Sequence, residues 1–127
     1  KKLGCFGLMS SFSTYFGHTM STIEGGFITT NNENFYELLL MLRSHGWDRD
    51  LSKGTQNMLR KECNVDDFNS LYTFYVPGFN FRPTELQSFI GLGQLKKLDD
   101  ICKIREKNFQ YYQKNLHSFV LYPYHLQ

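Results

Sequence analysis

One amphipathic pattern, in residues 31–46, constrains the fold of this chain more than any other feature. The run Asn31–Glu33 is a favourable helix start, because an Asn side chain accepts hydrogen bonds from the free amides and Glu suits the positive end. Arg43 then supplies a cation near the end, and Gly46 is the glycine that commonly follows a helix. The apolar residues at helical spacing are Phe35, Leu38, Leu39 and Leu42. The pattern predicts a helix with one apolar face.

Three short runs predict strands. Residues 5–12 are apolar with small residues and predict a buried strand, and the hydroxyl-rich residues 13–24 predict a loop. Two glycines then turn the chain into the β-branched run 27–30. Residues 71–76 predict a third strand, which Pro77 and Gly78 end, whereas the charged residues between Asp48 and Lys53 predict an exposed turn.

A second helical pattern begins after Pro83, which suits the first turn of a helix. Gly91 and Gly93 each weaken a helix by about 1 kcal/mol, which indicates close packing there; a kink or a break between two helices is the alternative. Asp99 and Lys103 stand one turn apart in the favoured order. The apolar stripe comprises Leu86, Phe89 or Ile90, Leu95, Leu98, Ile101, Phe109, Tyr112 and Leu116.

Short strands with amphipathic helices predict an α/β fragment. So few strands leave sheet edges exposed, which indicates missing partners from the rest of the chain or from a second subunit. The start, residues 1–7, has neither an initiator Met nor a signal-peptide pattern. We therefore expect the chain to be part of a longer protein.

Composition excludes several classes of function. A net charge of +2 is too small to indicate a nucleic acid or an anionic membrane as partner, and no apolar run approaches membrane-spanning length. The three cysteines are scattered and the four histidines lack ligand spacing, which argues against a disulfide framework and against a metal site. The cysteine pattern fits a reducing, cytoplasmic environment.

Several polar residues are candidates for chemistry. His18 lies in the hydroxyl-rich loop after a strand, where α/β proteins often place their sites, although an ordinary exposed histidine is the simpler interpretation. Ser13 and the nearby hydroxyls could hold a phosphate. His45, Trp47 and Arg49 form a polar-aromatic cluster past a helix end, for which a capped terminus is the simpler interpretation.

Three segments also carry recognisable motifs, in order. Residues 13–26 have Ser13, then His18 five positions later, then a hydroxyl-rich link to Glu-Gly-Gly. Residues 42–46 read Leu-Arg-Ser-His-Gly, and residues 78–92 contain Gly-Phe-Asn-Phe-Arg followed by Thr-Glu-Leu-Gln and Ile-Gly-Leu. Together they resemble the DegT-type sugar aminotransferase family, fold-type-I enzymes that use pyridoxal phosphate (PLP).

This resemblance implies that residues 1–127 are a partial, aspartate aminotransferase-like domain of the large-domain type. The family's upstream half, which supplies the aspartate for the pyridine nitrogen, and most of the C-terminal small domain would be missing. We do not expect an isolated segment of this kind to catalyse a reaction.

His18 stands where the family carries its PLP-binding lysine. An imidazole cannot form the imine that lysine makes, so the resemblance implies a noncovalent cofactor that could act as pyridoxamine phosphate (PMP). This substitution, and residues 44–49, resemble the nucleotide-sugar 3-dehydratase branch, in particular the GDP-4-keto-6-deoxymannose 3-dehydratases. Thr19 departs from the branch, which often has a second histidine there. Histidine suits proton transfer, since its pKa of about 6.5 allows uptake and donation near neutral pH.

Other roles follow from the resemblance, position by position. Ser13 matches the phosphate-binding serine, and Arg82 an arginine suited to an anionic ligand. Asn80 matches an asparagine that reaches the cofactor phosphate of the neighbouring subunit, which implies a homodimer. His45 and Arg49 match positions lining the site for the substrate or for glutamate, the amino donor that recharges PLP to PMP.

The sequence therefore predicts a segment of a PLP- or PMP-dependent nucleotide-sugar 3-dehydratase of lipopolysaccharide or other surface polysaccharide biosynthesis. Two alternatives stay open. One is a nucleotide-sugar aminotransferase of the same family, and the other is a noncatalytic remnant that serves as a dimerisation module. The residues do not decide between GDP and CDP, nor whether an iron–sulfur reductase takes part.

Overall fold

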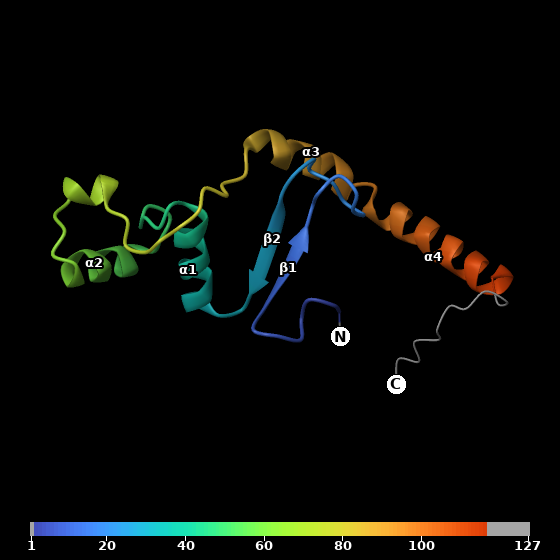
Figure 1. The fold of residues 1–127 in the computed structure, drawn as a ribbon, viewed down its shortest axis with the longest axis horizontal. Coiled ribbons are helices and arrows are strands. Elements are labelled where there is room, and N and C mark those ends of the chain that lie inside the picture. Colours follow the sequence, from blue (N-terminus) through green and yellow to red (C-terminus); the bar gives the residue numbers. More distant parts are fainter. Residues whose placement is uncertain (1, 117–127) are drawn as a thin grey trace. The chain divides into compact units, whose positions relative to one another are not determined.

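The computed structural model describes residues 2–116 and divides into two compact units. The first comprises Lys1–Ser13 and Gly26–Thr84, and the second Thr14–Gly25 and Glu85–Gln127. The elements are β1 (Met9–Ser13), β2 (Gly26–Thr30), α1 (Glu33–Arg43), α2 (Lys53–Glu62), the 3₁₀ helix η1 (Asn69–Tyr72), α3 (Glu85–Leu95) and α4 (Leu98–Asn115) (Figure 1). This mixture confirms the predicted α/β fragment.

In the first unit β1 and β2 run antiparallel (Figure 1). Met9 pairs with Thr30 and Ser13 with Gly26. This pairing confirms the loop after Ser13 and the strand at 27–30. The buried strand predicted at 5–12 is wrong in two respects: β1 begins only at Met9, and four of its five side chains are exposed. Because β2 ends opposite Met9, residues 5–8 have no ladder partner in β2, and a two-stranded ladder by itself covers neither face.

Helix α1 confirms the strongest prediction from sequence. The side chain of Asn32 accepts a hydrogen bond from the Phe35 amide at 3.0 Å, so the expected cap is formed. At the other end the amide of Gly46, with φ of 88°, donates to the carbonyl of Met41 at 2.8 Å. The buried face differs in detail, since Met41 is 6% exposed and Leu38 is 41% exposed.

The region after α1 contains a helix that the sequence did not reveal. Ser52 caps α2, which has few apolar residues and so lacks the run of large hydrophobic side chains that marks α1 in the sequence. The exposed turn predicted between Asp48 and Lys53 is wrong at both ends, because Asp48 is fully buried and Lys53 starts α2. Glu37 of α1 accepts hydrogen bonds from the Ser52 amide at 3.0 Å and from the Thr55 hydroxyl; these bonds, that of Thr55 first, lower the pKa of Glu37.

The strand predicted at 71–76 is also wrong. The chain forms η1 up to Tyr72, because Asp66 caps the turn by accepting hydrogen bonds from the Asn69 amide at 2.7 Å and its side chain at 2.8 Å. These two bonds lower the pKa of the Asp66 carboxyl. Aromatic and β-branched residues fit a sheet only where a partner strand exists, so local capping decides here.

The second unit resolves the question of one long helix or two. The chain breaks after Leu95, and α4 begins at Leu98. The close packing expected at Gly91 is confirmed, since a Cβ there would lie 3.2 Å from the Thr22 methyl, but nothing lies within 4 Å of the corresponding position at Gly93. On α4, Lys103 pairs with Asp100 at 3.4 Å and not with the predicted Asp99. Residues three apart and residues four apart both lie on the same helix face, so either carboxylate is within reach of Lys103.

Few apolar side chains are covered in the described residues. Met41 and Leu51 are the buried hydrophobic residues there, and the predicted stripe along α3 and α4 is largely exposed. Within residues 2–116 no helix combines the length and the apolar composition that crossing a membrane requires.

Candidate functional site

The loop Thr14–Gly25 of the second unit is closed at its base by hydroxyl groups. Thr14 is buried, and its hydroxyl lies 2.6 Å from the hydroxyl of Thr22. The Thr14 amide donates to the carbonyl of Gly25 at 2.9 Å, and the Thr22 amide donates to the carbonyl of Thr14 at 2.8 Å. The hydroxyl residues noted in the sequence therefore hold the two ends of the loop together.

Helix α3 supports the same loop. The side-chain amide of Gln87 donates to the backbone carbonyl of Glu24 at 2.8 Å. Gly91, one turn further along, leaves room for the methyl group of Thr22. Glu24 of the first motif and Gln87 of the third are thus in direct contact, and Thr22 of the first motif lies beside Gly91 of the third.

His18 lies within this supported loop with its side chain exposed. Its amide donates to the carbonyl of Tyr15 at 3.0 Å, and its ring lies edge-on to the Tyr15 ring at 6.2 Å. The backbone on which His18 stands is therefore ordered by hydrogen bonds, whereas the imidazole is open to a ligand. Ser13 is exposed at the end of β1 in the other unit.

In the first unit the second motif meets the start of the third. The amide of Phe79 donates to the carbonyl of Leu42 at 2.7 Å, and that of His45 donates to the carbonyl of Phe79 at 2.7 Å. Ser44 and Asn80 form an isolated antiparallel bridge. This pairing places Asn80, which is exposed, directly beside the end of α1.

Around Trp47 the structure gathers three of the predicted ligand-binding residues. The guanidinium carbon of Arg49 lies 3.7 Å from the centroid of the indole, and that of Arg82 lies 5.3 Å from it. The His45 ring meets the indole edge-on at 5.2 Å, and Phe74 stacks on it at 6.0 Å. We call these five residues the Trp47 cluster. It combines two exposed guanidinium groups with a half-buried imidazole.

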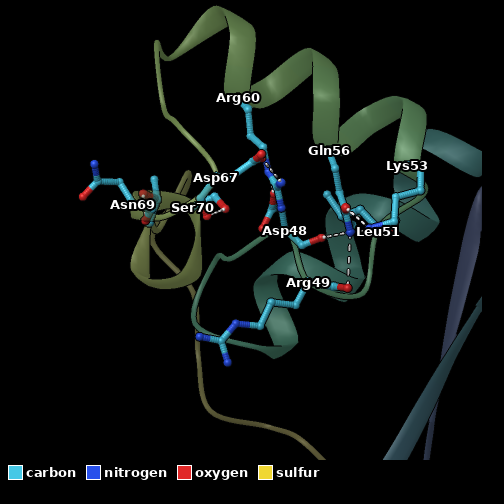
Figure 2. Close-up of polar contacts among 10 residues, drawn as sticks. Asp48, Arg49, Leu51, Lys53, Gln56, Arg60, Asp67, Asn69 and Ser70 are labelled. Atoms are coloured by element: carbon cyan, nitrogen blue, oxygen red, sulfur yellow. Dashed lines mark hydrogen bonds and ion pairs between the residues drawn. The ribbon is translucent and has the colours of Figure 1, made fainter.

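The turn that carries Arg49 is tied to α2 (Figure 2). Asp48 accepts a hydrogen bond from Nε of Arg60 at 2.8 Å, and the Gln56 side chain donates to backbone carbonyls of the turn. The hydrogen bond with Asp48 raises the pKa of Arg60. The pKa of Tyr75 is raised by burial and then by the charge of Asp48.

Sequence reasoning missed part of this arrangement. Phe74 falls in the predicted strand 71–76, and the sequence analysis predicts no helix at α2, so it does not reveal the support from Gln56 and Arg60. Ser52 before Lys53, with Thr55 following, was a capping signal that could have revealed the helix. Ser13 and His18 belong to different units from each other, so the described geometry joins only His45, Arg49 and Arg82, with Asn80 adjacent.

These residues suit a noncovalently held phosphorylated cofactor. Hydroxyl, amide and guanidinium donors, such as those of Ser13, Asn80 and Arg82, are the groups that bind phosphate oxygens. The loop Thr14–Gly25 contains no lysine, so it offers no primary amine to the aldehyde of PLP. The exposed imidazole of His18 gives this loop a group that can both accept and donate a proton.

Comparison with known proteins agrees with these features. The sequence profile of the DegT/DnrJ/EryC1/StrS aminotransferase family matches residues 1–125. The GDP-4-keto-6-deoxy-D-mannose 3-dehydratase of Escherichia coli O55:H7 is 41% identical over 98% of this chain and 31% of its own length. The enzyme of the same name from Yersinia pseudotuberculosis is 38% identical over 98% of this chain and 30% of its length. A GDP-perosamine synthase from Caulobacter vibrioides is 32% identical over 91% and 26%.

Solved structures give the same picture. The Escherichia coli GDP-4-keto-6-deoxy-D-mannose-3-dehydratase with bound hydrated PLP matches with a TM-score of 0.78 and 39% identity, over 94% of this chain and 30% of that one. A structure of a 3-dehydratase of this name with a trapped PLP-glutamate geminal diamine matches with a TM-score of 0.76 and 40% identity, over 90% and 29%. The chain thus spans about a third of the length of the relatives it matches.

Proposed function

The chain belongs to the DegT/DnrJ/EryC1/StrS aminotransferase family, and on this basis we propose that it is a segment of a nucleotide-sugar 3-dehydratase. The enzyme would use noncovalent PLP or PMP and convert a GDP-linked 4-keto-6-deoxyhexose into a 4-keto-3,6-dideoxyhexose for surface polysaccharide biosynthesis. Residues 1–127 would be part of its larger, aspartate aminotransferase-like domain.

The observation that carries the proposal is His18. It occupies the lysine position of the motif, in a loop whose base is closed by Thr14 and Thr22 and supported by Gln87. The loop therefore has the order expected of an active-site segment, but it lacks the amine that an aminotransferase of this family uses. A histidine there retains proton transfer and loses covalent attachment.

The relatives support the same choice. The two curated 3-dehydratases are 41% and 38% identical to the chain, whereas the GDP-perosamine synthase of Caulobacter is 32% identical. Structures of 3-dehydratases hold hydrated PLP, a PLP-glutamate adduct or, in a mutant, GDP-perosamine. These ligands are the classes we propose for this protein: PLP, glutamate and a nucleotide sugar.

Roles for the residues follow from their chemistry. When bound, the cofactor supplies a pyridine ring that withdraws electrons. The imidazole of His18 would take a proton from the reacting carbon and donate one to the departing C3 hydroxyl. Ser13 would hold the cofactor phosphate, and Asn80 would reach the phosphate of a second subunit in a homodimer. Arg82 would meet an anionic group.

The Trp47 cluster supplies the substrate side of this proposal. His45 and Arg49 would line the site for the nucleotide sugar or for glutamate. Both face the same indole at distances of 5.2 Å and 3.7 Å, and both ligands carry the negative charge that a guanidinium binds in a bidentate manner.

The decisive experiment identifies the product. The complete gene product that contains this chain is mixed with PLP, glutamate and a GDP-4-keto-6-deoxy sugar, and the sugar is analysed by mass spectrometry. We expect loss of the oxygen at C3. A 4-amino sugar with that oxygen retained would replace the proposal with an aminotransferase. An unchanged sugar would favour the noncatalytic alternative.

A further inference from the structure

We propose that Gln56 and Arg60 of α2 are positioning residues for Arg49. They fix the turn on which Arg49 stands and thereby set the affinity of the Trp47 cluster for its anionic ligand. This inference rests on the proposed function, because it takes Arg49 as a ligand-binding residue.

Gln56 holds the backbone of the turn. Its side chain is 4% exposed, and its Nε2 atom donates to the carbonyl of Asp48 at 3.0 Å and to that of Leu51 at 3.2 Å (Figure 2). A third contact, at 3.4 Å, reaches the carbonyl of Arg49 itself. One buried amide group therefore contacts three carbonyls within four residues, and these carbonyls would otherwise need other donors.

Arg60 holds the side chain of Asp48, the residue directly before Arg49. Its Nε lies 2.8 Å from Oδ2 of Asp48, whose side chain is completely buried (Figure 2). Within the described residues, the other carboxylate oxygen of Asp48 has no hydrogen-bond partner, so Arg60 is the charged group that compensates this buried charge. The outer nitrogen of Arg60 also meets Asp67 at 3.3 Å, but Asp67 is fully exposed.

Arg49 depends on this turn for its orientation. It follows Asp48 directly, and its guanidinium lies over Trp47, the residue before Asp48. The same guanidinium donates to the carbonyl of Leu71 and lies 5.6 Å from the Tyr72 ring. The buried Asp48 thus lies in sequence between Trp47 and Arg49, which both belong to the Trp47 cluster. A shift of the turn by about 1 Å would misalign a bidentate contact from Arg49 to a phosphate or carboxylate.

A purely structural role for α2 makes a different prediction. If Gln56 and Arg60 only stabilised the fold, removing them would lower the melting temperature and leave the affinity of the folded enzyme unchanged. If Gln56 and Arg60 act through Arg49, replacing them lowers the affinity for the anionic ligand. The same replacements have no further effect on that affinity once Arg49 itself has been replaced.

A double-mutant cycle tests the difference in the complete, PLP-loaded gene product. KM for the GDP-4-keto-6-deoxy sugar, KM for glutamate and kcat are measured for Gln56→Met, Arg49→Lys and the double variant. We expect Arg49→Lys to raise one KM by about tenfold. Gln56→Met should raise the same KM by about tenfold with kcat changed less than about twofold, and the double variant should be no worse than Arg49→Lys.

Two further variants make the test robust. Arg60→Lys keeps the charge but cannot reproduce the Nε contact to Asp48, and it should raise the same KM if Gln56→Met does not fold. Asp67→Asn removes only the exposed partner of Arg60 and should leave every KM unchanged. Multiplying effects in the double variant, or a fall in melting temperature at constant KM, would overturn the proposal. The product of the wild-type enzyme reports separately on the proposed function.

Discussion

At the scale of single residues, His18 changes the chemistry that this loop can support. The residues that hold the loop, Thr14, Thr22 and Gln87, all use neutral hydrogen bonds and do not depend on the side chain at position 18. The exposed imidazole is therefore replaceable without loss of the surrounding structure. Because the groups that hold the loop differ from the group proposed to transfer protons, position 18 is suitable for substitution.

Replacing His18 with lysine should restore covalent attachment of the cofactor. In His18→Lys, the new amine can react with the PLP aldehyde, so borohydride reduction should leave the cofactor fixed to the protein. Dehydration should fall by about two orders of magnitude or more, because the proton-transfer group is changed. Intact-protein mass spectrometry and the product assay measure the two effects.

The matched control is His18→Gln, which removes the imidazole without adding an amine. It should lose dehydration to a similar extent but remain free of cofactor after borohydride reduction. If His18→Lys also stays free of cofactor, His18 does not lie at the cofactor.

At the scale of elements, the end of α1 and the segment 75–81 are joined by backbone contacts. The amide of Tyr75 donates to the carbonyl of Gly46 at 2.8 Å, and a Cβ on Gly78 would lie 2.3 Å from the Gly46 nitrogen. Two glycines thus allow two backbones to approach at the site where His45 and Asn80 stand. Close backbone contact, and not burial of large side chains, joins these elements.

Gly46→Ala should disrupt this contact. Gly46 has φ of 88°, and its Cβ would lie 1.7 Å from the carbonyl oxygen of Val76. We expect a loss of about 3 kcal/mol in the free energy of unfolding, together with weaker substrate binding, because the backbone on which His45 and Asn80 stand must move. Thermal unfolding and calorimetry measure these effects.

Gly54→Ala is the control, because the only atom near its Cβ position is the Ser52 hydroxyl at 3.9 Å, an ordinary contact, and α2 is helical there. It should raise stability by about 1 kcal/mol, since alanine favours a helix over glycine. Equal and small effects at both glycines would show that the close approach at Gly46 is not required.

At the scale of the whole molecule, the exposed apolar surface is the dominant feature. Helix α3 leaves Leu86, Phe89 and Leu92 at 63–75% exposure, and the described residues contain two buried hydrophobic side chains. The relatives are about three times as long as this chain, and a resemblance in the third motif points to a second subunit at Asn80. We therefore expect these faces to be covered in the homodimer that we propose.

Subunit complementation tests the shared site. If Asn80 serves the cofactor of the neighbouring subunit, His18→Gln and Asn80→Ala proteins should each be inactive alone. Mixed dimers of the two would contain one intact site, so random reassociation should recover about a quarter of the wild-type activity. The dehydration assay on reassociated mixtures measures this recovery.

Light scattering checks that each variant is a dimer. Without this check, a failure of the subunits to exchange could be mistaken for evidence that the two subunits do not share a site. Dimers that mix, as shown by two affinity tags, without any recovered activity would place Asn80 and His18 in the site of one subunit.

Local patterns were enough to predict some of this protein from sequence. The Asn32 cap and the glycine end of α1 were predictable because each depends on neighbours a few residues away. The loop from Ser13 and the strand after Gly26 were predictable for the same reason. The three motifs together identified the family, because their order along the chain is itself the signal.

Only the tertiary structure decided the rest. It placed Asp48 in a buried ion pair with Arg60, gave residues 71–76 no partner strand within the described residues and gathered Arg49 and Arg82 around Trp47. A charged side chain is buried only where a distant partner compensates it, and a strand persists only where another strand pairs with it. Those partners are distant in sequence, so the sequence determined which groups are present and the fold determined which of them meet.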